Sequence, residues 1–174
     1  MVYVIVGIVC SLIVYVIMCY TNLVKLHNIA KEQWSQIDVY LKRRANLIPN
    51  LVDIVKGYAK NETDIFESTI EVKDKILNAK NEREELEANK DLSIAISKVF
   101  SLADGYPELK SNTNFLDLQN NLKEMEDKIS YARGFYNDSV LKYKNKSDIF
   151  PTNIISKILE FETMPFFEVA DNEH

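Results

Sequence analysis

Hydrophobic residues are distributed along this chain in two ways, first as one unbroken run and then as stripes of helical spacing. Residues 1–20 contain no Asp, Glu, Lys, Arg or His, and the first lysine is Lys25. About twenty helical residues span roughly 30 Å, which is the thickness of a hydrocarbon core. The pattern predicts a single membrane-spanning helix, and we assign residues 1–22 as its anchor.

Two alternatives for this segment fit the residues less well. A cleaved signal peptide needs a basic start and small residues at its cleavage site, and neither is evident. Lipidation of Cys10 is disfavoured because Val9 stands where a small residue is expected. A retained anchor is the favoured interpretation. Lys25 and Lys31 follow it closely, so the positive-inside rule predicts an external N-terminus and a cytoplasmic helical domain.

Beyond the anchor, apolar residues recur every three or four positions, as on one face of a helix. The first such stripe is Trp34, Ile37, Leu41, Ala45 and Ile48. We expect this helix to end near residue 48 and others to cover 49–80, 91–103 and 114–149, with a short terminal helix over 152–161. The expected caps are Asn46, Asp91 and Asn114.

The gaps between these stripes predict the connections. The charged segment 81–90 interrupts the apolar pattern and is expected to be a solvated turn or helix end, while Gly105 and Pro107 should stop the third helix. We expect Gly134 to permit close packing of the fourth helix. The predicted fold is all-α, with one transmembrane helix followed by an elongated antiparallel four-helix bundle over residues 23–163 and an acidic flexible tail over 164–174.

Composition and charge exclude several functions. The formal net charge is -5, and basic residues are interleaved with acidic ones, which argues against nucleic-acid binding. The two histidines lie at positions 27 and 174, and both cysteines lie in the apolar run. We therefore expect no metal site, no cofactor, no catalytic residues and no enzymatic activity.

Two features near the first stripe have alternative interpretations. Lys42, Arg43 and Arg44 could bind anionic headgroups, but a continuous helix would hold them about 30 Å beyond the span. Trp34, the only tryptophan, could anchor a partner, although its place at the head of a stripe favours core packing.

Specific residues occur densely directly behind the apolar run and again in later patches. The first run reads Trp34-Ser35-Gln36-Ile37-Asp38, then Leu41-Lys42-Arg43-Arg44, then Leu47-Ile48-Pro49-Asn50-Leu51-Val52, and then Val55-Lys56-Gly57-Tyr58. The later patches are Tyr106-Pro107, Leu109-Lys110, Asn114-Phe115, Ala132-Arg133, Phe135-Tyr136-Asn137 and Phe150-Pro151. Together they resemble the LemA family of bacterial membrane-anchored helical proteins over almost the whole chain.

The resemblance implies an N-terminal membrane helix, a small external N-terminus and a cytoplasmic antiparallel bundle. It implies no catalytic residues. The matching positions are candidates for an interaction surface or a buried network, and they are Trp34, Asp38, Arg43, Arg44, Pro49, Asn50, Lys56, Tyr58, Arg133, Tyr136 and Asn137.

These observations favour a non-enzymatic adaptor, held by one span in the bacterial inner membrane, that binds another inner-membrane or envelope protein. The alternatives are a self-assembling structural or membrane-remodelling protein, which would form homo-oligomers, and an enzyme.

Overall fold

The computed structural model describes residues 1–168, and it divides into two compact units. We call residues 1–34 with 134–166 the anchor unit, and residues 35–133 with 167–168 the bundle unit. The acidic tail assigned to 164–174 therefore lies largely outside the described residues.

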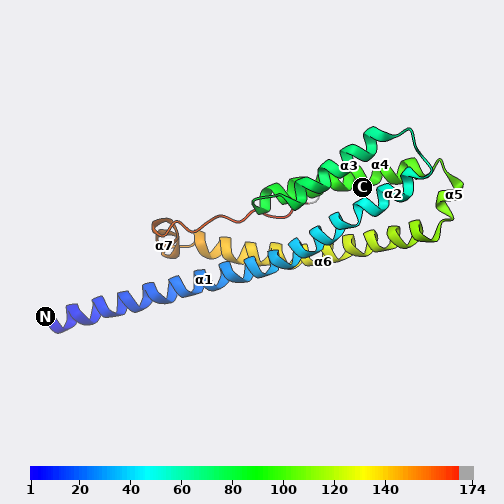
Figure 1. The fold of residues 1–174 in the computed structure, drawn as a ribbon. Coiled ribbons are helices and arrows are strands. Elements are labelled where there is room, and N and C mark those ends of the chain that lie inside the picture. The colour runs from blue at the N-terminus through cyan, green and yellow to red at the C-terminus, as the bar shows by residue number, and fades with distance from the viewer. Residues whose placement is uncertain (169–174) are drawn as a thin grey trace. The chain divides into compact units, whose positions relative to one another are not determined.

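Every regular element in the described residues is a helix, so the predicted all-α class is confirmed (Figure 1). The longest are α1 (Val2–Asn46) and α6 (Thr113–Asp148), and each contributes to both units. The others are α2 (Ile48–Lys56), α3 (Thr63–Leu77), α4 (Glu82–Ala103), α5 (Pro107–Lys110) and α7 (Thr152–Ile158).

In the anchor unit, the first part of α1 is exposed on all sides, and the following part packs against the rest of the unit. Residues 1–18 are exposed, and Cys19 is the first buried position, followed by Leu23 and Ala30. Opposite this packed part, the second half of α6 buries Tyr136, Val140 and Tyr143. The Trp34 and Tyr136 rings lie 5.2 Å apart between centroids, which confirms Trp34 as a packed residue.

An extended segment after α7 is fastened to this unit by tyrosine hydroxyls. Tyr136 Oη donates a hydrogen bond to the Pro165 carbonyl oxygen at 2.7 Å, and Tyr143 Oη donates one to that of Glu162 at 2.8 Å. The Phe161 ring packs edge-on against Tyr20, with centroids 6.0 Å apart. The chain after α7 is thereby held against α1 and α6.

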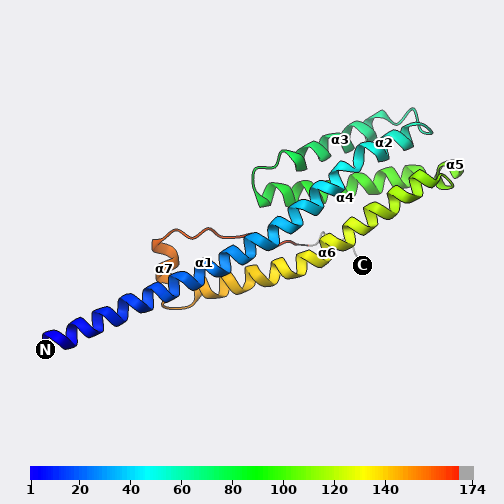
Figure 2. The ribbon, with the colours of Figure 1, turned by 60° about the horizontal axis from the view of Figure 1, so that its bottom comes forward.

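In the bundle unit, α2, α3, α4 and the first half of α6 run in alternating directions, and α3 lies beside α4 (Figures 1 and 2). The end of α1 leads into α2 after the single residue Leu47. The core is aliphatic, with the largest fully buried side chains at Ile37, Leu41, Ile48, Leu51, Ile76, Leu92 and Leu109. This is the antiparallel bundle that one apolar face per helix requires.

The expected helix over 49–80 is wrong in one respect, because it is two helices. The break between α2 and α3 covers residues 57–62 and starts at Gly57, the residue type other than proline that least favours helix interiors. At the end of α3, Ile76 is buried and Leu77 is exposed.

The expected turn over 81–90 is also wrong. Glu82 to Lys90 form the first turns of α4, and Asn81 rather than Asp91 is the cap, its Oδ1 accepting a hydrogen bond from the Glu84 amide at 3.0 Å. Four positions of this charged stretch are buried, namely Glu85, Leu86, Ala88 and Asn89.

Two further expectations about helix ends and one about Gly134 are corrected. Leu47, not Asn46, precedes α2, and it makes no side-chain capping bond. Asn112, not Asn114, caps α6, since its Oδ1 accepts from the Phe115 amide at 3.2 Å. Gly134 is exposed, and a Cβ added there would meet no described atom within 4 Å apart from the neighbouring backbone of its own helix. Gly134 therefore does not permit a close approach of another helix.

Candidate interaction site

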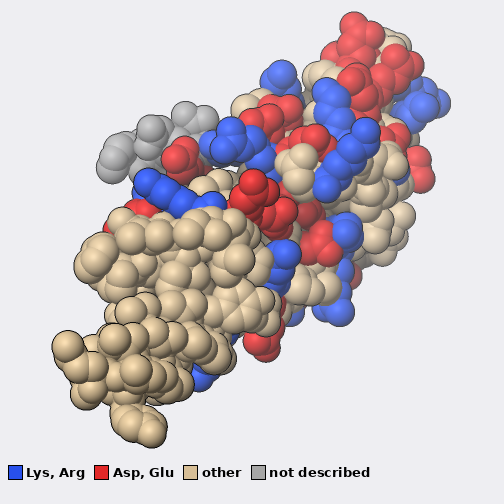
Figure 3. Space-filling model, turned by 90° about the vertical axis from the view of Figure 1, so that its left-hand side faces the viewer, with Lys and Arg blue, Asp and Glu red and all other residues tan. Residues whose placement is uncertain are grey.

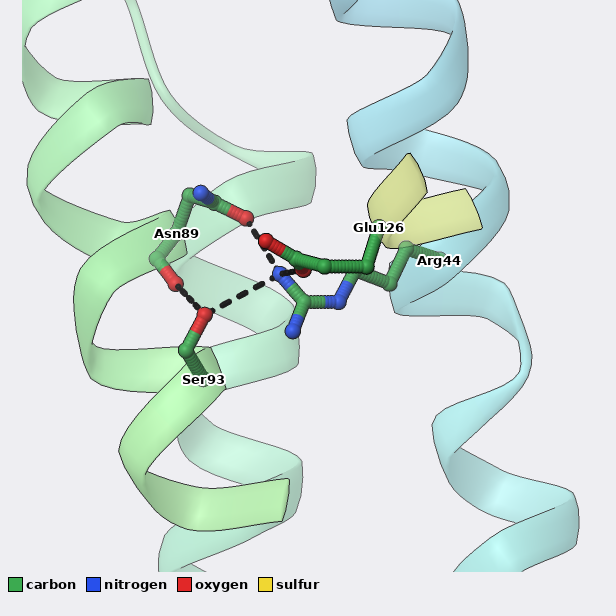
Figure 4. Close-up of polar contacts among 4 residues, drawn as sticks. All are labelled: Arg44, Asn89, Ser93 and Glu126. Carbon is green, nitrogen blue, oxygen red and sulfur yellow. Dashed lines mark hydrogen bonds and ion pairs between the residues drawn. The ribbon is translucent and has the colours of Figure 1, made fainter. Parts of the chain in front are cut away.

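The bundle unit contains a buried guanidinium group that joins three helices. Arg44, near the end of α1, is only 5 % exposed. Its Nη1 lies 3.0 Å from Asn89 Oδ1 and 3.1 Å from Ser93 Oγ, both on α4, and 2.8 Å from Glu126 Oε2 on α6 (Figure 4). Ser93 Oγ in turn donates to the Asn89 carbonyl oxygen at 3.2 Å. We call these four residues the Arg44 network.

Burial and pairing act on this arginine in opposite directions. Desolvation lowers the pKa of the Arg44 guanidinium, and the nearby Glu126 carboxylate raises it. Glu126 is half exposed, so it retains solvent on one side of the pair. Arg44 Nε is buried without a hydrogen-bond partner among the described atoms. A buried charge is stable only while its partners remain in place, so the network fixes α1, α4 and α6 in one register.

A second polar cluster, formed by Asp38, Lys42 and Glu85, lies nearer the N-terminal ends of α1 and α4. Lys42 Nζ pairs with Asp38 Oδ1 at 2.6 Å, and this hydrogen bond raises the pKa of Lys42. Glu85 is 5 % exposed, and burial, reinforced by the hydrogen bond and negative charge of Asp38, raises its pKa to about 8. Glu85 is therefore protonated at neutral pH, which avoids a buried negative charge next to the half-buried carboxylate of Asp38.

A groove of about 760 Å³ opens beside the Arg44 network. It runs along α4 and is bounded by Ile65 of α3, by α6 from Glu126 to Arg133, and by Phe167 and Glu168. Asn89, Ser93 and Glu126 belong both to its lining and to the network.

The groove has a mixed polar and apolar surface. Ser93, Ser97 and Ser101 follow one another at four-residue spacing, so they form one stripe of small side chains along α4. Ile94, Leu102 and Ile129 supply the apolar surface, while the basic side chains are Lys90, Lys98 and Arg133. Because Glu126 is paired with Arg44, Glu168 is the acidic lining group without a cation within ion-pair distance in the described residues.

The candidate residues predicted in the bundle unit do not form one patch. Arg44 and Asp38 lie in the two polar clusters, and Arg133 lines the groove, with Nη2 3.5 Å from Ser130 Oγ. Tyr58 Oη accepts a hydrogen bond from Asn112 Nδ2 at 3.2 Å. The other predicted positions are exposed or half-buried on the surface, namely Arg43, Pro49, Asn50 and Lys56.

The remaining candidates belong to the anchor unit. Trp34 and Tyr136 pack against each other, and Tyr136 also holds the extended segment through Pro165. Asn137 is half-buried beside Tyr136 in sequence. The positions of Trp34 and Tyr136 are explained by packing rather than by an exposed surface.

Sequence reasoning missed the partners of Arg44. Asn89 and Ser93 lie in or beside the charged stretch that was expected to be a turn, and Glu126 was not among the candidate residues. The signal that could have found them is the spacing of Glu85, Asn89 and Ser93, which places all three on one side of a helix.

Comparison with known proteins identifies the family. The sequence model of the LemA family matches residues 33–174. The chain belongs to the LemA family. This LemA-family chain is also similar to Magnetosome protein MamQ of Magnetospirillum gryphiswaldense, with 21% identity over 183 residues that cover 90% of this chain and 67% of the relative. Two MamQ proteins of Paramagnetospirillum magneticum, MamQ 1 and MamQ 2, are each 22% identical over 184 residues, covering 91% of this chain and 68% of each relative.

The family assignment agrees with a membrane association. The N-terminal part of α1 is long and apolar enough to cross a membrane, with a mean hydropathy of 2.8 over its most apolar 18 residues, of which only 6% are buried within the protein. A helix of this kind that belonged to a soluble core would be mostly buried. Its exposure in the described residues is what a lipid-facing helix requires.

Proposed function

We propose that this LemA-family protein is a non-enzymatic interaction module of the bacterial cell envelope. In this proposal, α1 anchors it in the inner membrane and the bundle unit binds a helix of another inner-membrane or envelope protein. The observation that carries the proposal is the groove along α4, since a concave surface that combines apolar residues with a few charged ones is typical of a binding site.

The dimensions and chemistry of the groove favour a helix as its ligand. The stripe of Ser93, Ser97 and Ser101 leaves room along α4 because its side chains are short. A helix that inserted apolar residues against Ile94 and Ile129 would bury them in the manner of known helix-in-groove complexes. Lys90, Lys98 and Arg133 would favour acidic residues along the edge of that helix.

The Arg44 network holds three of the residues that line the groove in place. It ties α4 to α1 and α6 through the Arg44 side chain, so the two walls that bear Asn89, Ser93 and Glu126 keep a fixed spacing. A preformed groove binds with a smaller entropic cost than one that must be assembled on binding.

Membrane attachment and orientation complete the proposal. Attachment to a membrane is supported by the apolar part of α1 and by the similarity to the magnetosome proteins MamQ of two species. Lys25 and Lys31, directly behind the span, favour an external N-terminus and a cytoplasmic bundle unit.

The proposal assigns no reaction to the protein. Within residues 1–168, no group of three or more His, Cys, Asp or Glu side chains could hold a metal ion. The carboxyl pair of Asp38 and Glu85 does not line the groove, and its role in the proposal is to pack α4 against α1.

Filling the groove tests the proposal. Ser97→Trp places a bulky side chain at an exposed groove position, and Ser111→Trp places the same side chain at an exposed position that does not line it. The full-length protein is purified from detergent-solubilised membranes, and quantitative mass spectrometry compares what copurifies with each variant. We expect one membrane or envelope protein to be lost with Ser97→Trp and retained with Ser111→Trp. Equal recovery with both variants would refute the groove as the binding site.

A further inference from the structure

The apolar surface of the anchor unit is larger than the spanning helix alone. Five residues around α7 expose most or about half of their side chains, and they are Ile149, Phe150, Ile154, Ile158 and Leu159. Phe150 is 75% exposed and Ile158 is 72% exposed. Clusters of exposed large apolar residues in a soluble protein mark sites of contact with another apolar phase.

The exposed face of α7 is apolar, whereas a helix on the surface of a water-soluble protein exposes its polar face. Ile154 and Ile158 are four residues apart and therefore share one face, and that face is the one turned away from the protein. The buried side includes Thr152. On the surface of a water-soluble protein, a helix would bury these isoleucines and expose the threonine to solvent.

Contacts within the anchor unit place this surface at the end of the membrane span. Phe161, two residues after Leu159, packs on Tyr20 at 6.0 Å and near His27 at 6.3 Å between ring centroids. Tyr143, near the end of α6, packs on His27 at 5.2 Å. In both ribbon views α7 lies beside α1 and the end of α6, which precedes Ile149 and Phe150 (Figures 1 and 2).

The extent of the exposed segment of α1 also places the end of the membrane span near Tyr20. Residues 2–18 are exposed and would span about 26 Å, whereas a hydrocarbon core is about 30 Å thick. The lipid-facing part of α1 therefore ends at about Cys19, where the packed part of the unit begins. The exposed residues of α7 and the preceding turn lie next to this level.

We propose that α7 and the Ile149–Phe150 turn lie in the membrane interface beside the span and form a second, monotopic contact with the bilayer. This proposal rests on α1 being membrane-inserted, but it is independent of what binds the groove. Seen from the side on which α1 projects, the surface nearest the viewer bears no Lys, Arg, Asp or Glu, and the charges are set further back (Figure 3).

The contact is hydrophobic rather than electrostatic. Lys157 is exposed at the edge of this surface, but so are Asp148 and Glu160, so the cation is offset by nearby acids. An interfacial helix of this kind buries its apolar face about 5–10 Å into the boundary between headgroups and acyl chains. We therefore expect binding to neutral phosphatidylcholine without a requirement for anionic lipid.

Tryptophan quenching by brominated lipid tests the proposal in the full-length protein. The protein is reconstituted in vesicles of dioleoylphosphatidylcholine that contain phosphatidylcholine brominated in its acyl chains. Phe150→Trp reports on the proposed contact, and Phe135→Trp is the matched control, because Phe135 is 51% exposed and lies on α6 well before the end of that helix at Asp148, whereas Phe150 follows that end. Tyr15→Trp reports on the span, and the emission of Trp34 in the parent protein is subtracted.

The proposal predicts that bromination removes about half or more of the added emission of Phe150→Trp, and little of that of Phe135→Trp. Strong quenching of Tyr15→Trp with equal, weak quenching of the other two would overturn the α7 contact while leaving the anchor intact. Absence of quenching at all three positions would overturn the anchor, and with it both this proposal and the tethering in the proposed function. Loss of a groove partner in the copurification experiment affects neither result.

Discussion

At the scale of single residues, Arg44 is the side chain on which the bundle unit depends most. It is buried, charged and bonded to α4 and α6 at once. Removal of such a group leaves Asn89 Oδ1 without its donor and leaves a cavity, and each of these effects destabilises a folded protein.

Replacement of Arg44 by alanine is expected to lower the free energy of unfolding by about 2–4 kcal/mol. Arg43→Ala is the control, because the neighbouring Arg43 is exposed, and its effect should stay within about 0.5 kcal/mol. Urea denaturation of the full-length protein in detergent micelles, followed by circular dichroism, measures both. Equal effects of the two substitutions would show that the Arg44 network does not stabilise the bundle.

Glu85 should make the stability of the bundle depend on pH. Its pKa is about 8 in the folded protein and near the ordinary glutamate value of 4.5 when unfolded. The folded state therefore binds the proton more tightly, and the resulting stabilisation is complete below pH 4.5 and is lost as the pH rises through 8. We expect the loss of stability over this pH range to be about 1–2 kcal/mol.

Glu85→Gln tests this dependence because glutamine keeps the shape and cannot ionise. We expect its free energy of unfolding to vary less than that of the parent between pH 5 and 9, since the titration is removed. Glu87→Gln, at an exposed position two residues away, is the control and should retain the parent profile. Parallel profiles for all three proteins would contradict a proton on Glu85.

Sequence reasoning reached only part of this residue-scale description. The position of Arg44 in a dense run of specific residues marked it as a candidate, but its charge and its neighbours Lys42 and Arg43 gave no sign that it alone would be buried. Its partners Asn89 and Glu126 lie far away in sequence, and only the packing of three helices brings them to it. Burial of polar residues is set by tertiary contacts that no local pattern records.

At the scale of elements, the helices followed the apolar stripes well where stripes were continuous. The stop at Gly105 and Pro107 and the end of α6 before Pro151 agree with the structure, because glycine and proline act locally. The split of α2 from α3 and the helical start of α4 were missed. At the start of α4, Leu86 and Ala88 are buried, but so are the polar residues Glu85 and Asn89. The buried face of this part of α4 therefore contains too few apolar residues to be recognised as a stripe.

Gly134, inside α6, and Gly57, directly after α2, should respond differently to alanine. Gly134→Ala is expected to stabilise the protein by about 0.5–1 kcal/mol, because the helix gains propensity and the added Cβ meets open space. Gly57→Ala should gain less or destabilise, since its Cβ would lie 3.2 Å from the Ile54 carbonyl oxygen. Thermal denaturation of both variants measures the difference, and a destabilised Gly134→Ala would show that this position needs glycine.

At the scale of the whole molecule, the family, the helical class and the apolar span are consistent with a protein whose work is done at a membrane surface. The sequence predicted this general organisation because hydropathy and helical periodicity are properties of long segments. It did not predict the groove along α4, which exists only where α3, α4 and α6 meet.

We propose that the groove along α4 binds another protein while α1 anchors this chain in the membrane. Site-specific photo-crosslinking in intact membranes tests it most directly, with a photoreactive amino acid at Ser97 in the groove and, as control, at Ser111 outside it. We predict one dominant adduct with an inner-membrane or envelope protein from position 97 that is absent from position 111. Adducts with a second copy of this chain alone would support self-assembly instead, and the same adducts from both positions would contradict a binding groove.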